Sequence, residues 1–206
     1  MPEKESFSAI ILAAGLSSRM GCPKQLLPVD GLSMLDHAIK AALTAGLEPP
    51  IVVLGHSAEH IKSQARLLSR CTVAINDSYK LGLSTSLICG IKASPPETTA
   101  FVFMLADQPL VTGTILKKLL NAFEKRRADI LYPTYQGKRG NPVIITSKLQ
   151  TRLLQAKGDS GARFLFSDPG LTVVPYPVTT PAVIIDIDTP EDLQILGHDE
   201  LLGKNR

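Results

Sequence analysis

Glycine, hydroxyl and cationic side chains are concentrated in one loop, residues 13–28, with the sequence AAGLSSRMGCPKQLLP. Its glycines let the backbone approach a ligand closely. Arg19 offers a planar fork of donors and Lys24 a point charge, so the loop suits a polyphosphate. The loop matches neither the Walker A nor the G-x-G-x-x-G pattern. The alternative is a plain strand-to-helix connection with two exposed cations.

Three aspartates follow apolar runs elsewhere in the chain. Asp107 comes after residues 100–105, and Asp186 and Asp188 lie at the end of residues 183–187. A carboxylate beside a triphosphate repels it unless a cation lies between them, and the oxygen-seeking choice is Mg²⁺. We therefore expect Asp107 and Asp186 to bind Mg²⁺, with Asp188 better placed to cap the following helix. In the alternative, these carboxylates are only structural.

The elements that must position these residues alternate between short β-branched runs and helical patterns. The predicted strands are residues 8–13, 51–54, 73–75, 100–105, 130–134, 143–145, 171–176 and 183–187. The predicted helices are residues 35–43, 58–68, 83–93, 114–127, 149–155 and 161–166, with a last helix opening at Pro190. This alternation predicts an α/β fold with a three-layer, doubly wound, mostly parallel sheet of Rossmann-like type. Ligands of such sheets bind beyond the carboxyl ends of the strands, so loop 13–28 and Asp107 should face the same crevice.

The composition indicates a globular protein and argues against several other classes. The chain has 206 residues, 44% of them hydrophobic, and a net charge of +3, so we expect one domain over residues 1–206. Tryptophan is absent and the densest basic cluster belongs to helix 114–127, so no nucleic-acid partner is expected. Three dispersed cysteines suit a reducing cytoplasm, where we expect the protein to be. The acidic N-terminus with its short apolar run predicts neither an export signal nor a membrane contact.

Five further motifs follow the loop in order. They are NDSYKLGLSTS from residue 76, LADQP from 105, GKRGNPV from 137, GDSGAR from 158 and DIDTPEDL from 186. Together with the loop they resemble the signature of MobA-like nucleotidyltransferases, over about residues 7–196. Within that family the chain looks most like the molybdenum cofactor cytidylyltransferase branch. The resemblance implies a Rossmann-like nucleotidyltransferase fold whose first loop wraps a nucleoside triphosphate.

The resemblance also implies roles for individual residues. Arg19 and Lys24 would hold the phosphates and Asp107 the metal, so these three are the expected catalytic residues. The residues expected to bind the nucleotide are Leu12, Ala13, Ala14, Gly15, Ser17, Ser18, Gly21, Asn76, Gly82 and Ser86. In the alternative, residues 76–86 only form an Asx turn and start a helix. The residues expected to bind the acceptor are Gly140, Asn141 and Arg163, so the N-terminal half would bind nucleotide and the C-terminal half the acceptor.

The activity implied by the resemblance is Mg²⁺-dependent transfer of CMP from CTP to the phosphate of molybdopterin or of the molybdenum cofactor, with release of pyrophosphate. Similar cytidylyltransferases carry Ala-Ala-Gly where guanylyltransferases carry Ala-Gly-Gly, so the methyl group of Ala14 favours a pyrimidine. A molybdenum hydroxylase would be a possible partner.

Three alternatives stay open from the sequence. They are transfer to a sugar phosphate or another phosphate acceptor, a guanylyltransferase of the same fold, and a non-catalytic carrier of molybdenum cofactor. The set of Arg19, Lys24 and Asp107 argues against the carrier, because a carrier needs no metal carboxylate.

Overall fold

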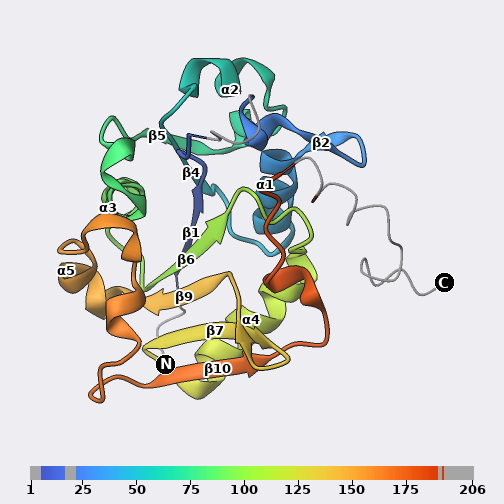
Figure 1. The fold of residues 1–206 in the computed structure, drawn as a ribbon. Helices are drawn as coiled ribbons and strands as arrows, with labels where there is room; N and C mark the ends of the chain where they lie inside the picture. The colour runs from blue at the N-terminus through green and yellow to red at the C-terminus, as the bar shows by residue number, and fades with distance from the viewer. Residues whose placement is uncertain (1–5, 17–21, 190–191, 193–206) are drawn as a thin grey trace.

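The computed structural model describes residues 6–16, 22–189 and 192, and its middle layer is an eight-stranded sheet (Figure 1). The strand order is β10-β7-β9-β6-β1-β4-β5, with β8 paired to β7. The strands are β1 (Phe7–Leu12), β4 (Ile51–Leu54), β5 (Thr72–Ile75), β6 (Ala100–Leu105), β7 (Ile130–Tyr135), β8 (Lys138–Arg139), β9 (Val143–Thr146) and β10 (Val173–Pro177). A separate short hairpin joins β2 (Pro28–Val29) to β3 (Leu32–Ser33).

The strand directions confirm the prediction of a mostly parallel sheet. The neighbours β6, β1, β4 and β5 all run parallel, and so do β7 and β10. The exceptions are β9, which runs antiparallel between β6 and β7, and the short β8, which pairs antiparallel with β7. Leu12 at the end of β1 pairs with Val53 on one side and with Leu105 on the other. The segments that follow β1 and β6 therefore start side by side at one edge of the sheet.

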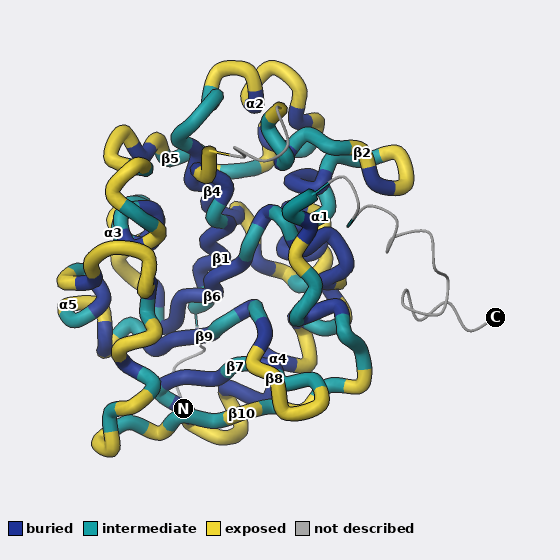
Figure 2. Tube along the Cα trace, in the orientation of Figure 1, coloured by how far each residue is buried: buried dark blue, intermediate teal, exposed yellow. Residues whose placement is uncertain are grey.

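Helices cover both faces of the sheet, which confirms the three-layer prediction (Figure 1). The helices are α1 (Met34–Thr44), α2 (Ala58–Gln64), α3 (Leu83–Ala93), α4 (Gly113–Arg126) and α5 (Gln150–Leu153). Successive side chains of a strand point to opposite faces. Accordingly, Ile11 packs in the cluster of α1, α2 and α4, whereas Ile10 packs in the cluster of α3 and α5. The central strands between the two helix layers are almost wholly buried (Figure 2).

Side-chain caps fix the starts of two helices and leave Asp107 available for another role. The hydroxyl of Ser33 accepts a hydrogen bond from the Asp36 N–H at 3.0 Å and begins α1. Thr112 begins α4 in the same way, accepting from the Ile115 N–H at 3.3 Å. Because Thr112 performs this function, Asp107 is not the cap of α4.

The prediction of a strand over residues 183–187 is wrong. A 3₁₀ turn (Pro181–Val183) is followed by a segment without regular secondary structure that pairs with no strand of the described chain. Its alternating pattern has another cause: Ile185 and Ile187 pack on Val29 and Met34 in a small cluster of their own. The Ile187 N–H donates to the carbonyl of Asp107 at 2.9 Å, so this segment crosses the edge of the sheet where β6 ends.

The remaining helix predictions are corrected in part or fall outside the described residues. Residues 149–155 and 161–166 form only short helical turns, the second a 3₁₀ turn (Arg163–Leu165). The helix expected to open at Pro190 lies outside the described residues. Within the described ranges, no helix combines the length and apolar character needed to cross a membrane.

Candidate active site

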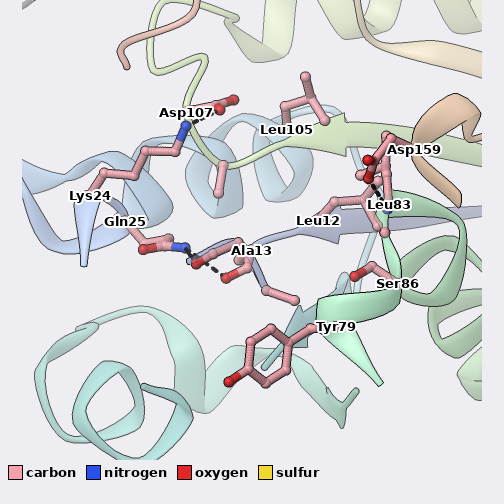
Figure 3. Close-up of a pocket in the computed structure, with 14 residues that line it drawn as sticks. Leu12, Ala13, Lys24, Gln25, Tyr79, Leu83, Ser86, Leu105, Asp107 and Asp159 are labelled. Atoms are coloured by element: carbon pink, nitrogen blue, oxygen red, sulfur yellow. Dashed lines mark hydrogen bonds and ion pairs between the residues drawn. The ribbon is translucent and has the colours of Figure 1, made fainter. Parts of the chain in front are cut away.

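A cavity of about 250 Å³ opens where β1 and β6 end (Figure 3). The end of β1 and its loop form one wall, β6 and the residues after it another, and the start of α3 a third. The lining residues are Leu12, Ala13, Ala14, Gly15, Lys24, Gln25, Tyr79, Gly82, Leu83, Ser86, Leu105, Ala106, Asp107 and Asp159. The expectation that the loop after β1 and Asp107 share one crevice is therefore met.

The ammonium group of Lys24 lies between two carboxylates. Its Nζ is 2.6 Å from Oδ2 of Asp107 and 2.7 Å from Oδ1 of Asp188, and the Lys24 side chain is only 16% exposed. Burial alone would lower the pKa of Lys24, but Asp107 and Asp188 together outweigh burial and raise it above its ordinary value. Lys24 therefore remains a cation at neutral pH and holds together two segments that are distant in sequence.

The second carboxylate oxygen of Asp107, Oδ1, differs from Oδ2 in that it accepts no hydrogen bond from Lys24. Oδ1 is buried and no described residue donates a hydrogen bond to it. Asp186 lies close by, and its Oδ1 accepts from Nε2 of Gln108 at 2.7 Å. Burial, and then the negative charge of Asp107, raise the pKa of Asp186 above its usual range. A buried carboxylate oxygen without a donor is costly, and a cation bound there would offset that cost.

This donor set fits Mg²⁺ in the way that nucleotide enzymes hold it. Among the described residues, no three acidic, histidine or cysteine side chains come close enough to enclose a metal ion by themselves. Mg²⁺ is usually bound by one or two carboxylates while substrate phosphates and water supply the other ligands. Asp107 with one neighbouring aspartate meets that requirement. Asp186 stays the predicted second ligand, but it is Asp188 that shares Lys24 with Asp107.

Gln25 holds the first residues of the loop that follows β1. Its side chain is buried, and Nε2 donates to the carbonyl of Ala13 at 2.9 Å and to that of Gly15 at 3.3 Å. Gln25 directly follows Lys24 in a 3₁₀ turn (Lys24–Leu26). The contact that sets the path of the chain after β1 therefore also sets the position of the Lys24 backbone (Figure 3).

Of the three residues predicted in segment 76–86 to bind the nucleotide, one has a structural role and two line the cavity. Asn76 is buried outside the cavity: its Oδ1 accepts from the Ser78 N–H at 3.0 Å, an Asx turn, and its Nδ2 donates to Ser86 Oγ at 2.9 Å. Gly82 and Ser86 line the cavity. The expected Asx turn is thus present, and Asn76 holds the hydroxyl of Ser86 in place.

A loop from the C-terminal half closes the third wall. Oδ1 of Asp159 accepts from the Leu83 N–H at 3.1 Å, and Ser84 Oγ donates to the carbonyl of Gly158 at 2.6 Å. A Cβ atom at Gly82 would lie 2.5 Å from the carbonyl carbon of Gly158, so only glycine permits this approach. The motifs that begin at residues 76 and 158 therefore meet at the start of α3.

A second cavity adjoins the first. Leu12, Leu83 and Leu105 line both, and the three residues expected to bind the acceptor, Gly140, Asn141 and Arg163, all line the second. The structure therefore places the expected nucleotide and acceptor residues in neighbouring cavities with a common wall. This is the arrangement that a reaction between two bound ligands requires.

The sequence predictions and the cavities overlap in part. Ser17, Ser18, Arg19 and Gly21 lie outside the described residues. Sequence reasoning assigned Asp188 to a helix cap, and it missed six lining residues: Gln25, Tyr79, Leu83, Leu105, Ala106 and Asp159. Gln25 had a signal, since it is the one polar residue in the apolar run after Lys24. Tyr79 and Leu83 had no such signal, because tyrosine and leucine are just as common in a hydrophobic core as in the wall of a binding site.

Comparison with known proteins shows extensive similarity. Residues 9–173 match the family described as the MobA-like NTP transferase domain. The molybdenum cofactor cytidylyltransferase of Escherichia coli (strain K12) is 30% identical over 191 residues, 91% of this chain and 93% of that protein. The nicotine blue oxidoreductase of Paenarthrobacter nicotinovorans is 29% identical over 172 residues, 80% of this chain and 83% of that protein.

Solved structures show the same architecture. Rv0371c from Mycobacterium tuberculosis H37Rv is 27% identical and superposes with a TM-score of 0.84, covering 93% of this chain and 97% of that one. Another structure of Rv0371c, described as a complex with manganese, is matched with 25% identity and a TM-score of 0.78, covering 97% and 100% of the two chains.

Proposed function

The chain belongs to the MobA-like NTP transferase family and is a nucleotidyltransferase, and we propose that it transfers CMP from CTP to the phosphate of molybdopterin, free of molybdenum or loaded with it. The observation that carries the proposal is the pair of adjoining cavities. One presents Lys24 and Asp107 beside the loop after β1, and the other holds the expected acceptor residues. The similarity to a molybdenum cofactor cytidylyltransferase over nine tenths of both chains supports the choice of substrates. A cytoplasmic location stays a prediction.

The chemical step is a direct transfer. A phosphate oxygen of the acceptor attacks the α-phosphorus of CTP, the new O–P bond forms, and the bond to the bridging oxygen breaks, so that pyrophosphate leaves with the electron pair. The attacking oxygen is already anionic, so the step needs no strong general base. The enzyme must instead bring two anions together and spread the charge of the transition state.

Lys24 and the aspartates supply this electrostatic environment. Lys24 stays protonated beside Asp107, so it presents a fixed positive charge where β1 and β6 end. Asp107, with Asp186 or Asp188, would hold Mg²⁺, which when bound neutralises charge on the triphosphate. The manganese in the complex described for Rv0371c is consistent with a divalent ion in this family.

The preference for CTP rests on Ala14. Ala14 is 4% exposed, is one of the residues that line the cavity, and belongs to a buried cluster against which Tyr79 packs. A Cβ atom built on Gly55 would lie 2.9 Å from the Cβ atoms of both Ala14 and Tyr79. The packing behind Ala14 is therefore close, and Ala14 has no space into which it could shift away from a bound base. A wall that keeps its extra methyl group leaves less room for a purine than for a pyrimidine.

Pyrophosphate release from CTP, GTP, UTP and ATP, each with Mg²⁺ and molybdopterin, tests the proposal. We expect release with CTP well above the other three and none when Mg²⁺ is replaced by excess chelator. Release only with GTP would make the protein a guanylyltransferase, and release only with a sugar phosphate as acceptor would reject molybdopterin. No release with any pair would contradict nucleotide transfer, and turnover of nicotine blue would then point to the activity named for the second relative.

A further inference from the structure

The second cavity combines an apolar floor with a cationic rim. Leu87, Phe103, Leu105, Val143 and Phe166 form much of the floor, and Arg139 and Arg163 stand at the rim. Its described lining residues include two arginines and no carboxylate. A site of this kind fits a ligand with an anionic group attached to an apolar body.

Arg139 is held in place by two aromatic rings. Its guanidinium carbon lies 4.1 Å from the ring centroid of Phe166 and 4.7 Å from that of Tyr132, and the two centroids are 5.4 Å apart. Both distances are within the range of favourable cation–π contacts. Contacts with ring faces restrict the position of a guanidinium and leave its N–H donors able to bind an anionic group.

The strand register distinguishes Arg139 from the lysine beside it. Arg139 on β8 pairs with Thr134 on β7, and Lys138 pairs with Tyr135. Paired residues share a face and successive residues alternate, so Arg139 shares the face of Tyr132, whereas Lys138 takes the opposite face. Consistently, Arg139 lines the cavity and Lys138 does not.

The backbone after Arg139 is fixed as well. The Gly140 N–H donates to the carbonyl of Pro133 at 2.9 Å, and the Asn141 N–H donates to that of Val183 at 2.8 Å. A Cβ atom at Gly140 would lie 2.3 Å from the Val183 oxygen, so the chain passes closer to Val183 than any side chain allows. These contacts fix the backbone next to Arg139, and the two aromatic rings position its guanidinium group.

We propose that Arg139 binds the phosphate of the acceptor and that the cavity selects a phosphomonoester carried by a planar ring system, whose faces can pack on apolar side chains, over a sugar phosphate. This inference rests on the proposed function, because it treats the second cavity as the acceptor site. A sugar would leave its hydroxyl groups against aliphatic and aromatic side chains, where they lose hydrogen bonds to water without replacement.

Steady-state kinetics with Arg139→Ala, and Lys138→Ala as the matched control, test the role of the arginine. Loss of a charged hydrogen-bonding partner should raise the KM for molybdopterin about 10- to 100-fold and leave the KM for CTP unchanged. The Lys138→Ala enzyme should behave as wild type. An unchanged KM for molybdopterin in Arg139→Ala, or an equal rise for both substrates, would overturn the proposal.

Binding without nucleotide separates this proposal from the proposed function. The probes are 4-nitrophenyl phosphate and ribose 5-phosphate, titrated by NMR into wild type and Arg139→Ala. We expect wild type to bind the aromatic probe more tightly, and Arg139→Ala to lose about tenfold or more of that affinity. Equal binding of both probes, or full affinity in Arg139→Ala, rejects the inference even if CMP is transferred. The expected binding together with no transfer to molybdopterin would support the cavity assignment and reject the activity.

Discussion

At the scale of single residues, the site is governed by charge. Lys24 lies within 2.7 Å of two aspartates, while the buried Oδ1 of Asp107 receives no hydrogen bond from the described residues. One ammonium therefore serves several carboxylates, and the surplus negative charge is what a divalent cation would neutralise. Substitutions of individual residues in and around this site should therefore affect different properties: turnover, nucleotide selection or stability.

Lys24→Ala should lower the rate of CMP transfer by about 10²- to 10³-fold, the usual loss when one charge-stabilising donor is removed from an active site. Pyrophosphate release under saturating substrates measures it. Lys92→Ala, which removes an exposed lysine from α3, is the control and should keep full turnover. Normal turnover in Lys24→Ala would mean that Lys24 is only a structural counter-ion for the aspartates.

Ala14→Gly should relax the choice of base. Removing one methyl group from a packed wall is worth roughly 1–3 kcal/mol of discrimination, so the ratio of kcat/KM for CTP over GTP should fall about tenfold or more. The comparison is internal, since both nucleotides are tested with the same variant. A ratio equal to that of wild type would show that the base is selected elsewhere in the cavity.

Asp186→Asn should stabilise the metal-free protein at neutral pH. Burial and Asp107 raise the folded-state pKa of Asp186, so its ionised form penalises folding, and stability is lost as the pH rises through that pKa. Asparagine keeps an acceptor for Gln108 and carries no charge. With chelator present, the Tm of Asp186→Asn should exceed that of wild type at pH 7.5, and the gain should shrink toward pH 4.5. A gain independent of pH would contradict this origin.

At the scale of elements, β1 and α3 determine where the site forms. β1 lies between β6 and β4, so the loop that follows it opens beside the end of β6. α3 packs directly on β1 through Gly90, where a Cβ atom would lie 2.3 Å from Cγ2 of Ile10. The start of α3, which carries Ser86 into the cavity, depends on this close approach.

Gly90→Ala should therefore destabilise the protein although alanine is the better helix former. The clash with Ile10 costs about 1–3 kcal/mol, which exceeds the roughly 1 kcal/mol gained in helix propensity. We expect a fall in Tm of about 2–4 °C, for a net loss near 1 kcal/mol. Cys89→Ala, at the preceding half-buried position, should leave the Tm nearly unchanged. A more stable Gly90→Ala protein would contradict the packing of α3 on β1.

Helices and strands with a regular apolar pattern and clear ends were predictable from the sequence. The predicted bounds of β4, α3 and β6 coincide with those observed, because each has a strong apolar pattern and clear breakers. The strand prediction for residues 183–187 was wrong because alternating isoleucines also arise where a segment without regular structure packs in a small separate cluster. Nor could residue spacing show the antiparallel direction of β9, which is decided by tertiary contacts.

The site was predictable where residue chemistry is distinctive and not where position alone matters. Lys24, Asp107, Gly82 and Ser86 were found because charge, flexibility and hydroxyl groups in a loop suggest a phosphate ligand. The pairing of Asp188 with Lys24 depends on how a segment without strand structure crosses the sheet edge. That path follows from packing of distant residues, which local sequence does not encode.

At the scale of the whole molecule, the two halves of the chain meet along one wall. Leu12, Leu83 and Leu105 separate a cavity beside the loop after β1 from one built largely by the C-terminal half. Two anionic ligands bound on either side of these residues would be held close together. Bringing two anions together is the main barrier to phosphate attack on a triphosphate.

The fate of the α-phosphate tests this account most directly. With CTP labelled at the α-phosphate, molybdopterin and Mg²⁺, we predict that wild type transfers the label to a cytosine dinucleotide of molybdopterin, and that Asp107→Ala transfers none. The same reaction with CTP labelled at the γ-phosphate should release all the label as pyrophosphate. An α-label that never joins molybdopterin, or that joins it equally well with Asp107→Ala, would contradict the account.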